Sequence, residues 1–552
     1  MKSRILAAVA AVVCAFALAL PCAAWADMAG TAPASQTIAG STRYETAAQT
    51  ARQWVAENGE TEGVIVASGA GYADALSASG LAGLLGYPVL LTDPNQLQAC
   101  TLTALKACGS SLDVIVVGGT AAVSAAVERE LEYYDSDGSV TRLAGSDRYA
   151  TNDAILAYGA SHGGWQGCAV VATGANYADA LAASPYAYWA KAPVVLTGGS
   201  LSARAVETLK ACVTLGAGYA AVVTGGTAAV SETAYAAVSA VVSGNVKRLS
   251  GETRYETGLQ IVKWEMLQGM TLEGMGCATG ANFPDALASG PLLGARGSVL
   301  ALASPDASNN TALLEYLAPY AGTVSSVTFL GGTAALPQSV RDSVIEALST
   351  GIYVGGTITL GTYEQDNDTS DGAEAIKWKI LAIEDGKALV ISKYALDCQP
   401  YNTVAGAYTW ETCSLRTWLN SSFYNTAFST SDKARILTTE VVNTNNIYHG
   451  TAGGNNTSDK VFALSDAEAK TYFANDEARE CAPTAYALAK GVWQSTTIMV
   501  DGVGACPWWT RTPAGYTDIK ASVVDTDGKI TEGGDSVDYA RNAVRPVMWV
   551  TL

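Results

Sequence analysis

The sequence predicts a layered α/β fold made of three tandem parallel-sheet repeats, followed by a separate α+β domain. Three observations lead to this prediction: motifs that recur three times in the same order, apolar segments that alternate with Ala- and Leu-rich segments, and a change of composition near residue 351. The chain has 552 residues, which is enough for three or four domains at about 150 residues each.

Three motifs define the repeats. The first, Gly-x-x-Arg-Tyr-x-Thr, has its arginines 105 and then 106 residues apart, at Arg43, Arg148 and Arg254. The second, aromatic-x-Asp-Ala-Leu, keeps these spacings and starts at Tyr72, Tyr177 and Phe283. The third, Gly-Gly-Thr, starts at Gly118, Gly225 and Gly331. Three motifs in one order, three times over, indicate a triplicated unit of about a hundred residues.

The first repeat shows the expected order of elements. Residues 64–67 form an apolar strand, 74–85 a helix and 88–91 a second strand; after a further helix, 114–117 form a third strand and 121–132 another helix. Apolar strands separated by helices are typical of a parallel sheet that is buried on both faces.

The N-terminus is expected to direct export. Lys2 and Arg4 precede an apolar run from Ile5 to Leu20, and residues 24–26 read Ala-Trp-Ala, so residues 1–26 are predicted to be a signal peptide and 27–37 a linker. After residue 26 no stretch has 18 uninterrupted apolar residues. The expected product is secreted to the cell surface, with no membrane span, lipid or covalent anchor.

Charge and histidine content exclude several function classes. The net charge is −18 without a basic block, so nucleic acid is not an expected partner. The chain has two histidines, His162 and His449, each in a Gly-bearing segment, which excludes histidine-rich zinc sites. No cofactor and no metal is predicted.

The repeated motifs, with Pro-Val-Leu-Leu-Thr between them, resemble the type-two cell wall binding repeat of Gram-positive surface proteins. The resemblance covers roughly residues 38–350 and divides them into repeats 38–142, 143–248 and 249–350. It implies three Rossmann-like units in a triangular arrangement that hold the protein non-covalently on an anionic cell-wall polymer, as surface-layer and adhesin proteins are held.

Residues 27–350 carry 15 basic and 27 acidic side chains, so local geometry has to provide any contact with an anion. One candidate is the set of strand-to-helix junctions that start at Ser68, Thr173 and Thr279, because free N–H groups at a helix start favour an anion. The resemblance implies a second, the apolar strand ends Val89, Leu90, Leu91, Val194, Val195, Leu196, Val299 and Leu300; the third copy has Ser298 where the others have proline. The alternative for these strand ends is a buried core.

The motif arginines and aspartates have two interpretations. They are expected to form an internal Arg–carboxylate pair or a helix cap repeated by ancestry, rather than to contact the ligand. The six residues are Arg43, Asp74, Arg148, Asp179, Arg254 and Asp285.

The region 351–552 is predicted to be a domain of its own. Residues 376–383 and 388–391 are expected to pair as a hairpin around Asp385-Gly386, 414–428 to form a helix, and a second hairpin to turn at Asp527-Gly528. The motifs Trp-Glu-Thr-Cys, Leu-Arg-x-Trp-Leu-Asn, Trp-Trp-x-Arg-Thr-Pro and Val-Arg-Pro-x-x-Trp resemble an uncharacterised bacterial domain family related to C-type-lectin-like and sulfatase-modifying folds.

Two functions compete for this domain: recognition of a glycan or peptide, and catalysis, which would make the protein a wall-anchored enzyme. Recognition is favoured, because the one histidine of the domain, His449, is expected to lie in a solvent-exposed loop, and the domain shows no metal cluster or Gly-x-Ser-x-Gly nucleophile. The candidate ligand residues are Trp508, Trp509, Arg511 and Arg545, with a purely structural role as the alternative. Residues 364–372 resemble a calcium loop with a displaced glycine and are expected to be a solvated linker.

Nine cysteines remain after the predicted signal peptide, so at least one is expected to stay free or to pair between chains. Cys277 is expected to be a buried free thiol. The preferred pairs are Cys168 with Cys212, Cys398 with Cys413, and Cys481 with Cys506.

Overall fold

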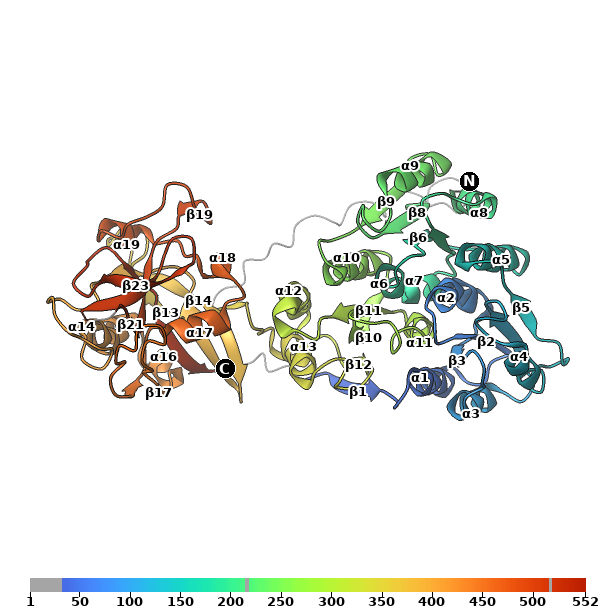
Figure 1. Cartoon of the computed structure of the whole chain (residues 1–552), viewed down its shortest axis with the longest axis horizontal. Helices are drawn as coiled ribbons and strands as arrows, with labels where there is room; N and C mark the ends of the chain where they lie inside the picture. The colour runs from blue at the N-terminus through green and yellow to red at the C-terminus, as the bar shows by residue number, and fades with distance from the viewer. Residues whose placement is uncertain (1–31, 214–217, 516–518) are drawn as a thin grey trace, which may run out of the picture.

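The computed structural model describes residues 32–213, 218–515 and 519–552. The predicted signal peptide lies outside the described residues. Figure 1 shows the two parts of the chain: the three repeats, from blue to yellow-green, and the C-terminal domain, from yellow to red. The helix α13 (Gln338–Thr350) ends the last repeat, and Gly351 follows it with a positive φ of 74°.

Each repeat forms a four-stranded parallel sheet whose last strand comes from the start of another repeat. The first sheet has the order β3-β2-β4-β5. Its strands are almost continuously buried Val, Ile, Leu and Ala, as a sheet with helices on both faces requires. The elements are α1 (Arg43–Asn58), β2 (Gly63–Ser68), α2 (Ala73–Leu85), β3 (Val89–Thr92), α3 (Ala99–Cys108), β4 (Asp113–Val117), α4 (Ala125–Leu131) and β5 (Thr141–Leu143).

The predicted elements of this repeat are confirmed, with one shorter helix. The helix expected over 121–132 begins at Ala125, because Ser124 caps it with its side chain and the residues after Gly-Gly-Thr form a turn.

The second repeat has the strand order β7-β6-β8-β9. Its central helix is split in two at Ala183, next to the proline of α7. The elements are α5 (Arg148–Ser161), β6 (Ala169–Thr173), α6 (Ala178–Ala182), α7 (Ser184–Trp189), β7 (Val194–Thr197), α8 (Ala203–Val213), β8 (Ala221–Thr224), α9 (Glu232–Val241) and β9 (Val246–Leu249).

The third sheet, in the order β1-β12-β10-β11, closes the three repeats into a ring. Its edge strand β1 (Ala34–Ile38) pairs in parallel with β12, so the start of the chain completes the last repeat. Residues 34–37 therefore belong to a strand, although the sequence placed them in a linker. The other elements are α10 (Arg254–Leu267), β10 (Thr271–Thr279), α11 (Gly290–Arg296), β11 (Ser298–Ala303), α12 (Thr311–Leu317) and β12 (Ser326–Leu330), with 3-10 turns at Ala307–Asn310 and Ala318–Tyr320.

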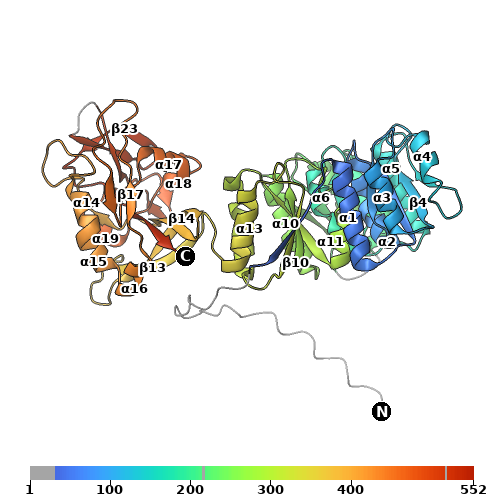
Figure 2. The same ribbon diagram turned by 90° about the horizontal axis from the view of Figure 1, so that it is seen from below.

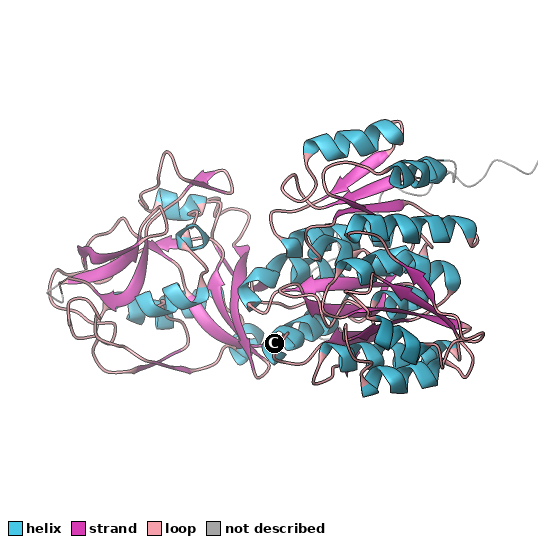
Figure 3. Cartoon of the chain, turned by 45° about the vertical axis from the view of Figure 1, so that its right-hand side comes forward, coloured by secondary structure: helices cyan, strands magenta, loops and turns pink. Residues whose placement is uncertain are grey.

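The helices α2, α7 and α11 meet at the centre of the ring, and the three sheets lie around them (Figure 1). Glycine permits this close packing. A Cβ added to Gly83 of α2 would lie 2.0 Å from the carbonyl oxygen of Tyr188 in α7. The triangular arrangement of parallel-sheet units follows from this centre and from the ring closure, and Figure 3 shows the sheets between their helices.

A guanidinium group caps the Gly-Gly-Thr turn of every sheet. In the first two repeats it belongs to the added strand: Arg142 and Arg248 each donate to the carbonyl oxygen of the first glycine of the turn. In the third repeat that strand position is Thr37, and Arg341 of α13 donates to the same carbonyl oxygen and to the Thr37 hydroxyl. The carbonyl oxygen of the first glycine therefore has an arginine donor in every repeat, but in the third repeat the arginine comes from a helix instead of the added strand.

The C-terminal domain is rich in antiparallel strands. Its two main sheets have the orders β13-β14-β15-β25 and β16-β24-β21-β22-β23. The strands are β13 (Thr357–Tyr363), β14 (Glu374–Glu384), β15 (Lys387–Ser392), β16 (Asp397–Cys398), β17 (Thr439–Val441), β18 (Thr457–Asp459), β19 (Met499–Val500), β20 (Val503–Gly504), β21 (Trp508–Pro513), β22 (Lys520–Val524), β23 (Ile530–Ser536), β24 (Ala543–Val544) and β25 (Val547–Thr551).

Both predicted hairpins of this domain are confirmed, and Asp385 and Gly386 have the positive φ values that a two-residue turn needs. The helix predicted over 414–428 contains a π-helical segment, Leu419–Phe423, between α14 (Ser414–Trp418) and α15 (Tyr424–Ala427). The remaining helices are α16 (Thr430–Arg435), α17 (Asp466–Tyr472), α18 (Asp476–Arg479) and α19 (Ala485–Ala489). The domain lies beyond α13, next to the third repeat (Figure 2).

Within the described residues, no helix has both the length and the apolar character needed to cross a bilayer.

Candidate functional site

The Gly-x-x-Arg-Tyr-x-Thr motif closes a loop at the start of α1, α5 and α10. The threonine hydroxyl accepts a hydrogen bond from the glycine N–H six residues earlier, with an N···O distance of 3.0 Å for Gly40 and Thr46. The same contact recurs at Thr151 and Thr257. The residue before each arginine caps the helix through its side chain. The motif therefore fixes where each helix begins and where its arginine points.

Each motif arginine reaches the carboxyl end of the central strand of its own repeat. Arg43 donates from Nη1 to the carbonyl oxygen of Gly69 at 2.8 Å, and Arg254 donates to that of Gly280 at 2.9 Å. Arg148 makes the equivalent bond to Gly174. Among the ion pairs of the described residues, none includes these three arginines. The partners are thus backbone carbonyls, and not the carboxylates expected from the sequence.

Three aromatic side chains meet where the repeats converge. The ring centroids of Tyr72, Tyr177 and Phe283 lie 5.3–5.7 Å apart in each pairing. Each ring also lies under the arginine of another repeat, with guanidinium carbons 5.4–5.6 Å from the centroids. We call the three rings and the three motif arginines the axial cluster.

Hydrogen bonds tie the axial cluster across the repeat boundaries at two of its three corners. Arg148 donates to the hydroxyl of Tyr72, and Arg254 donates to that of Tyr177, both at 2.9 Å. Phe283 has no hydroxyl, so the corner at Arg43 lacks this bond. All three rings and two of the arginines are half-buried, and Arg148 is exposed.

The motif aspartates pack under the Gly-Gly-Thr turns. A Cβ added to Gly118 would lie 2.7 Å from Oδ2 of Asp74, and the φ of Gly118 is +111°, so this position needs glycine. Asp179 and Asp285 meet Gly225 and Gly331 in the same way. Burial raises the pKa of Asp74 and Asp179 above the usual carboxyl range, while the charges of Arg148 and Arg254 partly oppose the rise.

The axial cluster offers positive charge and aromatic faces at the carboxyl ends of three parallel sheets. Open α/β sheets bind ligands at this edge. Guanidinium groups bind phosphate or carboxylate groups, and aromatic faces pack against the apolar faces of sugars. The arrangement is therefore suited to an anionic glycan that contacts the arginines of neighbouring repeats.

The strand-end residues named from the sequence are buried. The exposed fractions of Val89, Leu90, Leu91, Val194, Val195, Leu196, Val299 and Leu300 are 6% or less. Their side chains have no surface for a polymer, and in this structure they hold the strands β3, β7 and β11 in the core. Direct polymer contact through them stays a prediction without support from the geometry.

The strand-to-helix junctions differ between repeats. In the first two repeats they lead into α2 and α6, whose first turns have no side-chain cap. In the third repeat a turn follows the junction, and α11 begins only at Gly290. The three junctions therefore do not form three equivalent anion sites at helix N-termini.

Comparison with known families identifies the repeats. The cell wall binding domain 2 (CWB2) model matches three times, at residues 37–128, 142–235 and 248–341, which is more than half of the chain. The chain belongs to this cell wall binding family. Its repeats imply a cell-wall polymer as partner and a location at the cell wall or surface. The C-terminal region matches a domain of unknown function (DUF6273) at residues 385–552.

Two curated relatives come from Bacillus subtilis. The N-acetylmuramoyl-L-alanine amidase LytC is 29% identical over 334 residues, which are 60% of this chain and 61% of the relative. The amidase enhancer is 27% identical over 326 residues, 58% of this chain and 41% of the relative. The chain thus spans less than two thirds of the length of these relatives, and the match to the amidase falls in the region of the repeats.

Two solved structures from Clostridium difficile are similar to the CWB2 region. Cwp8 has 22% identity and a TM-score of 0.48, over 57% of this chain and 52% of that chain. Cwp6 has 24% identity and a TM-score of 0.49, over 58% of this chain and 48% of that chain.

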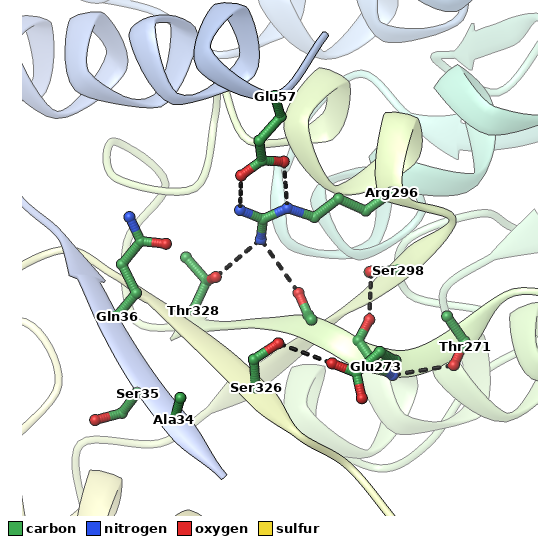
Figure 4. Close-up of a pocket in the computed structure, with 11 residues that line it drawn as sticks. Ala34, Ser35, Gln36, Glu57, Thr271, Glu273, Arg296, Ser298, Ser326 and Thr328 are labelled. Atoms are coloured by element: carbon green, nitrogen blue, oxygen red, sulfur yellow. Dashed lines mark hydrogen bonds and ion pairs between the residues drawn. The ribbon is translucent and has the colours of Figure 1, made fainter.

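A polar pocket of about 430 Å³ lies at the opposite, amino-terminal edge of the third CWB2 sheet (Figure 4). Arg296 of α11 forms a two-point ion pair with Glu57 of α1, at 2.5 and 2.8 Å, and donates to the Thr328 hydroxyl. Glu273 accepts hydrogen bonds from Ser325 and Ser326. The charged groups of this pocket thus have partners within the protein, and the Arg296–Glu57 ion pair joins the third repeat to the first.

The four C-terminal ligand candidates are core residues. The exposed fractions of Trp508, Trp509, Arg511 and Arg545 are 4% or less. Arg511 forms a two-point ion pair with Glu468 and donates to two backbone carbonyls. Ligand binding by these side chains has no support in the geometry, which favours the structural alternative.

The segment that resembles a calcium loop brings some acidic groups together. Carboxylate oxygens of Glu364, Asp366 and Glu374 lie within 4.8 Å of one another. Burial and the two neighbouring charges raise the pKa of Glu364. Glu374 accepts N–H bonds from Gln365 and Asp366, as in an ordinary turn.

The cysteines are thiols in the structure. Cys277 is fully buried, as predicted. None of the three preferred disulfides is formed; the seven cysteines concerned in these predictions are Cys168, Cys212, Cys277, Cys398, Cys413, Cys481 and Cys506. Cys481 and Cys506 nevertheless lie in hydrogen-bonding contact.

Sequence reasoning missed the aromatic rings of the axial cluster. The signal was present, because Tyr72, Tyr177 and Phe283 open the second motif. Only the ring arrangement brings these positions, about a hundred residues apart, into contact.

Proposed function

We propose that the repeats attach the protein non-covalently to an anionic secondary polymer of the cell wall, and that the C-terminal domain is displayed there to bind a ligand. The axial cluster is the main support. It places three guanidinium groups that have no carboxylate partner among the described residues beside three aromatic rings. Because the remaining surface is acidic, this local arrangement has to select the polymer.

Several weak contacts favour attachment through the whole ring. Once a polymer has made its first contact, the other two corners are held close to it, so the later contacts form more readily and the overall affinity rises. Guanidinium contacts with polymer anions are charge-assisted, so attachment should weaken as salt rises. A non-covalent contact predicts that chaotrope or high salt releases the protein from walls without a wall hydrolase.

The test is co-sedimentation of the full mature chain with purified walls. Arg148→Gln should lower binding about tenfold, because it removes a charge-assisted contact at the most exposed corner. Arg204→Gln is the matched control: the Arg204 side chain is 41% exposed and forms a local ion pair with Glu207, one turn along the same helix. Equal binding by the Arg148 variant and its control, both folded, would remove the axial cluster from the polymer site.

The second candidate is a wall-anchored enzyme whose C-terminal domain is catalytic. The similarity to an amidase suggests a hydrolase, yet this similarity lies in the repeats and not in the C-terminal domain. Turnover of any retained wall fragment by the intact protein would favour the enzyme.

A further inference from the structure

A small pocket opens on the C-terminal domain between β22, β23 and the loops that precede β19 and β24. Its volume is about 160 Å³. The residues that define its chemistry are Trp493, Asp525, Thr531, Asp535, Tyr539 and Asn542. None of them belongs to the candidates named from the sequence.

Asn542 shows that the pocket is built to meet a polar group. Its side chain is fully buried and lines the pocket. Nδ2 donates to Oδ2 of Asp535 at 2.8 Å, whereas Oδ1 has no hydrogen-bond partner. A buried carbonyl oxygen without a partner is unfavourable, and a donor from a bound ligand would satisfy it.

Two aromatic side chains lie at the pocket and remain open to solvent. Trp493 is 46% exposed and Tyr539 is 41% exposed. The backbone holds both: the N–H of Trp493 donates to the carbonyl of Arg541, and that of Tyr539 donates to Ser536. The faces of aromatic rings attract organic cations.

The polar lining consists mainly of acceptors. The carboxylates of Asp525 and Asp535 and the amide oxygen of Asn542 are acceptors, while the hydroxyls of Thr531 and Tyr539 and the indole N–H of Trp493 lie at the rim. The nearby Lys529 is paired with Asp527. The two carboxylates favour a positively charged group over a neutral sugar, and an ammonium group offers three donors together with a positive charge.

We propose that this pocket binds a primary ammonium group at the end of an aliphatic chain, as on a lysine side chain of a peptide. The volume suits one side-chain end and is below the range of pockets for larger ligands. The ammonium group donates to Asn542 Oδ1 and Asp535, and its methylene groups pack between Trp493 and Tyr539. The inference deepens the ligand-binding role proposed for this domain and does not depend on the polymer contact of the repeats.

The test is ligand-observed NMR with the full mature chain and Nα-acetyl-lysine N-methylamide. The matched probe, Nα-acetyl-norleucine N-methylamide, lacks the amine and should give no signal at the same concentration. N-acetylglucosamine is the third probe. Equal signals from the lysine and norleucine probes, or binding of N-acetylglucosamine alone, would overturn the proposal.

Variants locate the site. Asp535→Asn should weaken binding of the lysine probe about tenfold and Trp493→Ala about fivefold, while Trp493→Phe should retain most of it. Asp371→Asn, an exposed charge elsewhere in the domain, should change nothing. Wild-type affinity in folded Asp535→Asn and Trp493→Ala variants would overturn the assignment.

The same variants should sediment with purified walls like the wild type. If the lysine probe does not bind while wall attachment is intact, the pocket proposal is wrong and the polymer proposal is unaffected. Wall attachment of Arg148→Gln tests the polymer proposal for the repeats.

Discussion

The Phe283 corner of the axial cluster makes a sharp prediction, because the other two corners provide its controls. At those corners a tyrosine hydroxyl accepts a hydrogen bond from an arginine and donates to a backbone carbonyl. The guanidinium of Arg43 lies 5.5 Å from the Phe283 centroid, within the 5.4–5.6 Å range of the whole set. A tyrosine at 283 should therefore place its hydroxyl where Arg43 and the carbonyl of Gly69 meet.

The magnitude follows from these two new bonds. A net gain of about 0.5–1.5 kcal/mol is typical for one hydrogen bond, and solvent at this half-buried site reduces the gain. We expect Phe283→Tyr to stabilise the repeats by about 1 kcal/mol, which raises the melting temperature by roughly 1–3 °C for a unit of this size. Tyr177→Phe should lower it by a similar amount.

Differential scanning calorimetry of the full chain measures both shifts. The result that would refute the reasoning is a lower melting temperature for Phe283→Tyr together with no change for Tyr177→Phe. The corners would then not be equivalent, and the hydroxyl bonds would contribute nothing to the ring.

Three further predictions concern ring closure, the centre and the buried carboxylates. Glu57→Gln should weaken the ion pair to Arg296 and destabilise the protein by about 0.5–1.5 kcal/mol, with faster hydrogen exchange in β1; unchanged exchange would contradict a role in closure. Gly83→Ala should destabilise by about 2–4 kcal/mol in chemical denaturation, because an added Cβ meets backbone, whereas Gly71→Ala, with open space, should stay within about 0.5 kcal/mol. Burial raises the pKa of Asp179 in the folded state. The contribution of Asp179 to stability is therefore complete below the ordinary carboxyl range and is lost as pH rises through the raised pKa. Asp179→Asn should flatten this part of the plot of melting temperature against pH, and an unchanged plot would contradict the assignment to Asp179.

The local elements of the fold could be predicted from the sequence because their signals are local. The apolar strands and the Asp385-Gly386 hairpin depend on residues close in the chain, and three copies of each motif made the repeat boundaries visible. The edge strand β1 carries no such signal, because its partner begins at Ser326. A strand whose only neighbour is nearly three hundred residues away looks like a linker in the sequence.

The site was harder to predict than the fold. The sequence marked Arg43 and its copies, but the type of partner depends on which carbonyl groups the folded strands present. The apolar strand ends resembled a ligand motif but lie in the core, because helices cover both faces of each parallel sheet. In the C-terminal domain, conspicuous residues such as Trp508 and Arg511 are buried, whereas Trp493 and Asn542, which no motif marked, line a pocket.

The central claim is that the repeats recognise an anionic wall polymer. The most direct measurement is binding of the chain from residue 27 onward to two preparations of the same purified walls, one intact and one stripped of its secondary polymers, over a range of salt concentrations. The account predicts saturable binding to intact walls that weakens as salt rises, and little binding to stripped walls. Equal binding to both preparations would show that the protein recognises peptidoglycan itself and would contradict the account.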